Sequence, residues 1–321
     1  MATPQLNFLT PSTIVDKDAQ VRQKNKYLLE ASYRPFRFAN LPVELCLRIL
    51  TYATGCSQGT YRSLSLTSKR ISDLIRSEKM LEGVSVILTG ENQLLAFESF
   101  LKQRPEVTPH IHALWTICPG SVARITRVCV SIINTCTKIR SLACHPSVLL
   151  ESICRGKAFN HTRCVDLTMI EFRVTWNTFT ESSTHGAKFL NQLERLHIIG
   201  ALDQSLWATW AIIPKLDSLT HASIAMGSHR NITKALFSRV VESPKLQQVV
   251  ITTRLHGEDQ QMLSDNVQEI DERFSVVHRR RRWKESNLWH ESLQDPTRFW
   301  KQAKEEKDLP PAPRPTLKNS A

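Results

Sequence analysis

Short apolar segments recur along most of this chain at nearly constant spacing. Successive segments begin 23 to 30 positions after one another. The eight segments are Val84–Ile87, Ile111–Leu114, Ile139–Cys144, Cys164–Met169, Leu193–Ile198, Leu216–Leu219, Leu246–Ile251 and Phe274–Val277. A unit made of one short strand and one helix cannot bury its apolar faces alone, so neighbouring units must stack on one another. This spacing constrains the fold more than any single motif does.

Helical patterns fill the intervals between these segments. They cover Asn92–Gln103, Val122–Asn134, Ser147–Cys154, Ala187–Asn191, Leu206–Ile213, Ile232–Val241 and Gln260–Asp271. Strands that alternate with helices in this way form parallel sheets. We therefore predict an α/β fold with a curved parallel sheet backed by helices, an irregular solenoid over residues 81–282. A conventional doubly wound α/β domain is the alternative, because it shows the same alternation.

One segment carries a recognisable repeat signature. Leu193, Leu196 and Ile198 form the pattern Leu-x-x-Leu-x-Ile, which resembles a leucine-rich repeat, and the other segments are degenerate versions of it. The resemblance implies that side chains flanking the inward aliphatic residues lie on the concave face of the sheet and bind a target protein. These residues are Trp115, Asp166, Thr168, Arg195, His197, Thr220, Gln248 and Thr252. The alternative is that they form an ordinary polar sheet surface.

A helix with an apolar stripe is predicted ahead of the repeats. Leu41, Leu45 and Ile49 recur every four residues, the spacing that places side chains along one side of a helix. Pro42 suits the first helical position, and Glu44 suits the positive end of the helix dipole. Two shorter helices should follow. They can cover one side of the first helix, but its second apolar edge still needs a partner.

The same region resembles a known family. The pattern Leu41-Pro42-x-Glu44 and the later block Leu64-x-Leu66-x-Ser68-Lys69-Arg70 are similar to the F-box family over residues 38–80. The resemblance implies a three-helix module that docks on the Skp-type adaptor of a cullin–RING ubiquitin ligase. The implied adaptor contacts are Leu41, Pro42, Glu44, Leu45, Ile49 and Leu64. The alternative is that these helices only cap the domain that follows.

The remaining segments lie at the two ends of the chain. We predict a disordered arm over residues 1–37, because it is polar, and a disordered tail over 309–321, because it is rich in proline. Between the repeats and the tail, residues 283–308 should form one terminal helix. Its residues Trp289, Leu293, Phe299 and Trp300 are expected to cap the last repeat.

The chain is strongly basic. Its formal net charge of +12 favours acidic partners. The densest basic cluster is the run Arg279, Arg280, Arg281 and Arg282. Such a run serves as a nuclear-import signal or an anion-binding patch, or is simply a solvated surface. No RNA-binding, zinc-finger or helix-turn-helix pattern accompanies it, so we do not expect nucleic-acid binding to be the main function.

The sequence contains none of the catalytic and metal-binding motifs that we searched for. It lacks the G-x-G-x-x-G, P-loop, H-E-x-x-H and G-x-S-x-G patterns, and its eight cysteines include no C-x-x-C pair. We therefore expect no enzyme activity, no cofactor and no metal. No apolar run is long enough to cross a membrane. We expect a cytoplasmic or nuclear protein with reduced thiols.

Together these patterns predict the substrate-receptor subunit of a cullin–RING (SCF-type) ubiquitin ligase. The helical module would bind the adaptor, and through it the cullin, while the repeat domain holds an unidentified target protein. Such a receptor acts by proximity and needs no catalytic residue. The alternative is a ubiquitin-independent repeat scaffold for protein–protein interaction, which predicts that Leu41, Pro42 and Leu45 are buried.

Overall fold

The computed structural model describes thirteen parts of the chain. They are residues 38, 41–56, 58–75, 84–117, 123–154, 160–170, 176, 178–179, 184–199, 212–225, 234–255, 257–278 and 285–307. The chain divides into two compact parts, residues 1–48 and residues 49–321. The predicted arm and tail, the run Arg279–Arg282 and most of the predicted helix Leu206–Ile213 lie outside the described residues.

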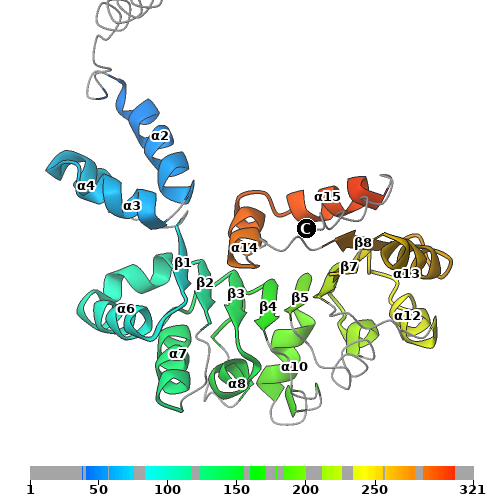
Figure 1. The fold of residues 1–321 in the computed structure, drawn as a ribbon. Coiled ribbons are helices and arrows are strands. Elements are labelled where there is room, and N and C mark those ends of the chain that lie inside the picture. The colour runs from blue at the N-terminus through cyan, green and yellow to red at the C-terminus, as the bar shows by residue number, and fades with distance from the viewer. Residues whose placement is uncertain are drawn as a thin grey trace, which may run out of the picture. The chain divides into compact units, whose positions relative to one another are not determined.

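The second part, residues 49–321, contains an open, curved sheet of eight parallel strands (Figure 1). The strands are β1 (Ser85–Leu88), β2 (Ala113–Thr116), β3 (Ser141–Cys144), β4 (Asp166–Ile170), β5 (Arg195–Ile199), β6 (His221–Ala225), β7 (Gln248–Thr253) and β8 (Phe274–His278). Each inner strand pairs with the strands before and after it in the chain, and β1 and β8 form the two edges, so strand order follows the chain. A doubly wound domain needs a point where this order reverses, and that alternative is therefore wrong.

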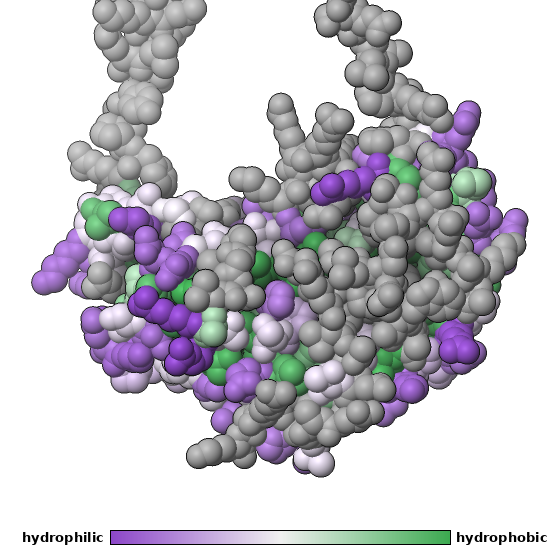
Figure 2. All heavy atoms as spheres, turned by 60° about the horizontal axis from the view of Figure 1, so that its bottom comes forward, coloured by the Kyte–Doolittle hydropathy of each residue, from purple (hydrophilic) through white to green (hydrophobic). Residues whose placement is uncertain are grey.

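Helices between consecutive strands cover one face of the sheet (Figure 1). They are α6 (Glu91–Gln103), η2 (Pro105–His110), α7 (Ala123–Thr135), α8 (Pro146–Leu149), η3 (Leu150–Cys154), α10 (Thr184–Asn191), η4 (Ile213–Lys215), α12 (Lys234–Val240) and α13 (Glu258–Gln268). Figure 2 turns this layer toward the viewer, and hydrophilic residues predominate on its coloured surface. The apolar sides of these helices pack inward against the strands.

The main core lies between the sheet and these helices. Leu114, Leu142, Leu167 and Leu196 lie opposite one another on β2 to β5, and all four are buried. Full burial of one such side chain contributes on the order of 1.5–3 kcal/mol. The leucines at the fourth position of the predicted repeat pattern therefore hold neighbouring units together.

A repeated backbone arrangement ties the amino ends of β3 to β7 to the preceding unit. One carbonyl oxygen accepts two N–H groups, that of the residue before the strand and that of the first strand residue. The His112 oxygen, for example, accepts from Arg140 at 2.7 Å and from Ser141 at 3.0 Å. The equivalent oxygens belong to Arg140, Val165, Glu194 and Thr220. The units are thus structurally equivalent although their sequences are degenerate.

Long polar side chains also join neighbouring units. Gln192 Nε2 donates to the carbonyl oxygens of His161 at 2.6 Å and Cys164 at 2.9 Å. The guanidinium of Arg273 donates to the carbonyl oxygens of Ser243 and Leu246, both at 3.0 Å. These bonds give the turn carbonyls side-chain donors from the neighbouring unit. They connect neighbouring units at the turns that precede the strands.

The sixth strand begins later than predicted. The apolar segment Leu216–Leu219 forms the turn that leads into β6, and the strand starts at His221. Leu216 and Leu219 are both buried in the main core. In the register of the sheet, Ala222 lies opposite Leu196. Because this strand position holds a small alanine, its apolar character was weak in the sequence.

The C-terminal segment forms two helices instead of the predicted single one. They are α14 (Glu285–Gln294) and α15 (Arg298–Lys307), and Figure 1 places them on the concave face of the sheet. Pro296 disfavours helical geometry at the residue before it. Asp295 Oδ1 accepts from the N–H of Thr297 at 3.0 Å and from its hydroxyl at 2.7 Å, which fixes the turn. The segment crosses the sheet rather than only capping the last unit.

Three helices precede the sheet, as the sequence predicts. They are α2 (Val43–Cys56), α3 (Gln58–Ser65) and α4 (Lys69–Ile75). Helix α2 begins one residue after Pro42, whose carbonyl oxygen accepts from the N–H of Cys46 at 3.1 Å. Ser68 caps the third helix, because its Oγ accepts from the N–H of Ile71 at 3.2 Å.

His161 should make the stability of the fold pH-dependent. Its side chain is buried, and burial lowers its pKa from 6.5 to about 4. Between these two values the unfolded chain binds a proton that the folded chain does not, so the free energy of unfolding decreases as pH falls. The full effect of a shift of this size is roughly 3 kcal/mol. We expect His161→Leu to lose less stability than the parent between pH 7 and pH 4.

Urea unfolding at the two pH values measures this difference. The substitution keeps the backbone oxygen of residue 161, to which Gln192 donates. Equal losses of unfolding free energy in the parent and the variant would contradict the assignment to this imidazole.

Candidate functional site

An exposed apolar stripe runs along helix α2. Leu45, Ile49 and Tyr52 are 47, 45 and 77% exposed. Their spacing places them within about 60° of one another around the helix axis. Cys46 and Leu50 lie on another side of the same helix and are buried. The helix therefore has one covered side and a separate apolar side that faces solvent.

The other predicted adaptor contacts lie at the start of this helix or on α3. Pro42 and Glu44 are exposed, and Leu41 and Leu64 are half-buried. Large exposed hydrophobic side chains are concentrated here. Among the described residues they are Val43, Leu45, Ile49, Tyr52 and Leu66, in or next to α2 and α3, and elsewhere only Phe100 and Met262. Isolated exposed hydrophobic residues need no explanation, but such a cluster indicates an interaction surface.

The concave face of the sheet is occupied by α14. The Trp289 ring lies with its centroid 5.5 Å from that of Trp115, in an edge-to-face arrangement. Trp289 Nε1 donates to Ser141 Oγ at 3.1 Å. A hydrogen bond of 2.6 Å joins Ser85 Oγ to Nδ1 of His290. These contacts attach α14 to strands β1, β2 and β3.

Helix α15 attaches to the later strands. Trp300 is buried beside Val250 and Val277 of β7 and β8. Its ring lies 4.8 Å from that of His221, and its carbonyl oxygen accepts from Gln248 Nε2 at 2.9 Å. The two C-terminal helices thus span the concave face from its first strands to its last.

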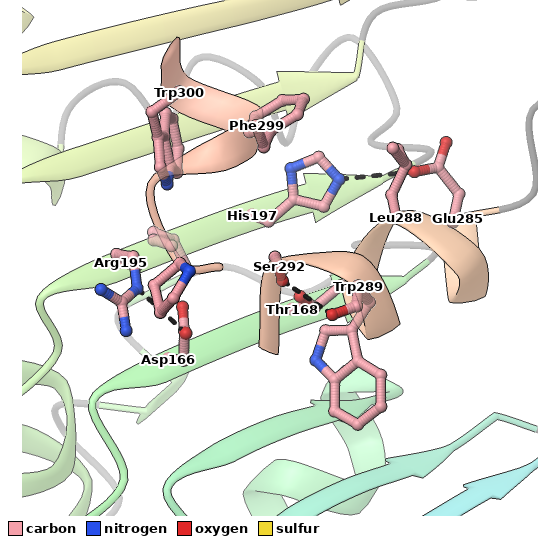
Figure 3. Close-up of a pocket in the computed structure, with 12 residues that line it drawn as sticks. Asp166, Thr168, Arg195, His197, Glu285, Leu288, Trp289, Ser292, Phe299 and Trp300 are labelled. Carbon is pink, nitrogen blue, oxygen red and sulfur yellow. Dashed lines mark hydrogen bonds and ion pairs between the residues drawn. The ribbon is translucent and has the colours of Figure 1, made fainter. Parts of the chain in front are cut away.

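A small cavity remains between the centre of the sheet and these helices (Figure 3). Its volume is about 50 Å³. On the sheet side, Arg195 Nε lies 3.0 Å from Asp166 Oδ2. Burial raises the pKa of the Asp166 carboxyl above its ordinary value, although the neighbouring guanidinium opposes this shift. On the helix side, Glu285 Oε2 lies 3.5 Å from His197 Nε2.

The structure brings together four of the eight predicted target contacts. Asp166, Thr168, Arg195 and His197 line the cavity. Trp115 and Gln248 lie on the same face but contact the C-terminal helices. The remaining two, Thr220 and Thr252, do not line the cavity. Thr220 precedes β6 and its hydroxyl donates to the Glu194 oxygen at 3.0 Å, whereas Thr252 is buried in β7.

Sequence reasoning missed the helix residues of this site. Glu285, Leu288, Trp289, Ser292, Phe299 and Trp300 line the cavity from α14 and α15. One signal was available, because Trp289, Phe299 and Trp300 are too apolar for a solvated end segment. Their aromatic rings were assigned to the last unit alone, while the structure uses them across the sheet.

The described residues contain no group of three or more histidine, cysteine or acidic side chains arranged to hold a metal ion. In the part of the chain that the structure describes, no helix is both long and apolar enough to cross a membrane. His112, which the sequence places two residues from His110, forms a 2.9 Å hydrogen bond with the carbonyl oxygen of Lys138.

Two comparisons with known proteins gave no match. No protein-family model matches the chain, and no curated protein matches it.

Proposed function

We propose that this chain is the substrate receptor of a cullin–RING ubiquitin ligase. Helix α2 docks on a Skp-type adaptor, and the eight-stranded domain, a degenerate leucine-rich-repeat solenoid, holds the target protein. The observation that carries the proposal is the exposed stripe of Leu45, Ile49 and Tyr52 on the helix that opens with Leu41-Pro42-x-Glu44. A stripe of this kind is the usual contact of an amphipathic helix with a protein partner.

The scaffold alternative expects residues at the start of α2 to be buried within the chain. It requires Leu41, Pro42 and Leu45 to be buried as part of an end cap. Pro42 and Leu45 are exposed and Leu41 is half-buried. Binding to a purified adaptor, described below, decides between docking and capping.

The receptor needs no catalytic group of its own. Holding a target near a ubiquitin-loaded conjugate raises the effective concentration of the target lysine. The eight-stranded domain offers a framework of stacked units for this role, since repeat domains present extended binding surfaces.

Size-exclusion chromatography of the full chain with purified Skp-type adaptor tests the proposal. We expect the two proteins to elute together, and a cullin to join the complex only when the adaptor is present. Separate elution of the chain and the adaptor at micromolar concentrations would contradict the receptor function and leave the scaffold alternative.

A further inference from the structure

A second and larger opening lies along the amino ends of β2 to β5. It is a groove of about 680 Å³, bounded by these strand ends, by the amino end of β1 and by the end of α14. Basic side chains from consecutive units line it, with Lys138 and Arg140 before β3 and Arg163 before β4. We call it the basic groove. None of these three residues was a candidate in the sequence, because Lys138 and Arg140 lie in one short turn and Arg163 lies in another.

The basic groove has an excess of positive charge. Its charged lining residues are four basic ones, Lys138, Arg140, Arg163 and Arg195, and one acidic one, Asp166. Asp166 is already paired with Arg195 at 3.0 Å. No residue that the structure describes forms an ion pair with Lys138, Arg140 or Arg163. Three exposed cations in one groove favour an anionic ligand, because opposite charges raise both the association rate and the selectivity.

The shape and the remaining lining distinguish between anionic partners. Apolar side chains, including Val84, Val165, Leu293 and Pro296, lie among the cations. The lining includes no Phe, Tyr or Trp. Proteins that bind single-stranded nucleic acid stack bases on such aromatic rings, so a nucleic acid would lack its main contact here. An extended peptide instead places alternate side chains on opposite sides, and can present acidic groups to the cations and aliphatic groups to the wall.

We propose that the basic groove binds an acidic segment of a protein chain, through Lys138, Arg140 and Arg163. The negative charge is that of carboxylates or of phosphorylated side chains, which share the same recognition by arginine. If the chain is a ligase receptor, this segment belongs to its target. The groove does not depend on that function, because none of its lining residues is in α2.

The test measures fluorescence anisotropy of labelled peptides with the full chain and no adaptor. The probes are a short peptide of alternating Glu and Val, the same peptide with phosphoserine for Glu, the neutral version with Gln for Glu, and a poly(dT) oligonucleotide of similar length. The variant Arg140→Glu/Arg163→Glu reverses two groove charges. Arg124→Glu/Arg239→Glu is the matched control, since both residues are exposed on α7 and α12 and the net charge changes equally.

We expect the Glu or phosphoserine peptide to bind the parent roughly tenfold or more tightly than the Gln peptide. The groove variant should lose this preference and the control variant should keep it, with thermal unfolding unchanged in both. The tighter of the two acidic probes identifies the source of the charge. The proposal is overturned if neither acidic peptide binds better than the Gln peptide, if both variants lose binding equally, or if only poly(dT) depends on Arg140 and Arg163. Adaptor binding is measured separately, so either proposal can fail alone.

Discussion

Replacing Leu45 and Ile49 together by glutamate should abolish co-elution of the chain with a Skp-type adaptor. Both side chains are nearly half-exposed on one side of α2, so the substitution leaves the covered side of the helix intact. Each residue has just under half of its surface left to bury in an interface, so the two together contribute roughly 1.5–3 kcal/mol. Losing both weakens binding by about tenfold to a hundredfold, at about 1.4 kcal/mol for each factor of ten. The charges that replace them add a desolvation cost.

A matched control separates loss of the apolar stripe from the effect of a new charge on the helix. Thr51 is exposed on α2 but lies away from the stripe, and Thr51→Glu should bind the adaptor like the parent. Isothermal titration calorimetry measures all three proteins, and circular dichroism checks their helix content. If the double variant binds the adaptor as tightly as the parent does, the complex forms through another surface and α2 is not the docking helix.

The strands of this fold were largely predictable because each unit repeats the same burial pattern. Leu193, Leu196 and Ile198 gave the pattern, and their equivalents recur at the predicted positions in β2, β3, β4 and β7. The pattern failed at β6, where a buried turn precedes the strand and Ala222 takes the place of a large aliphatic residue. A strand cannot be located from its large aliphatic residues when its own inward residue is small and the turn before it is apolar.

The use of the concave face was not predictable from the units. Repeat spacing fixes contacts between neighbours in the sequence, but the contact of Trp289 with Trp115 joins residues far apart along the chain. The same holds for the basic groove, since Arg140 and Arg163 become neighbours only through the pairing of β3 and β4. The sequence predicts Asp166 and Arg195 as members of one row on the concave face, and the structure adds that they pair with each other.

Trp289→Ala should release α14 from the sheet. The Trp289 side chain is only 5% exposed, it contacts Trp115, and its N–H donates to Ser141. Truncation of a buried tryptophan costs about 3–5 kcal/mol. Trp289→Phe keeps an aromatic ring and removes the N–H donor, so it should cost less. The lost hydrogen bond costs on the order of 1 kcal/mol, and the smaller ring adds the cost of the packing contacts that it no longer makes. Met262→Ala, at a 52% exposed position on α13, is the control and should change the unfolding free energy by less than about 0.5 kcal/mol.

Hydrogen exchange decides where this energy is lost. The units bury their main core on the other face of the sheet, so we expect faster exchange in α14 and α15 while protection of β2 to β5 persists. Leu293 and Pro296 of the C-terminal segment also line the basic groove, and this part of its apolar wall should be lost with them. Trp289→Ala should therefore weaken acidic-peptide binding without removing any groove charge. Unchanged exchange in α14 would contradict the anchoring role of Trp289, which rests on its ring contact with Trp115 and its hydrogen bond to Ser141.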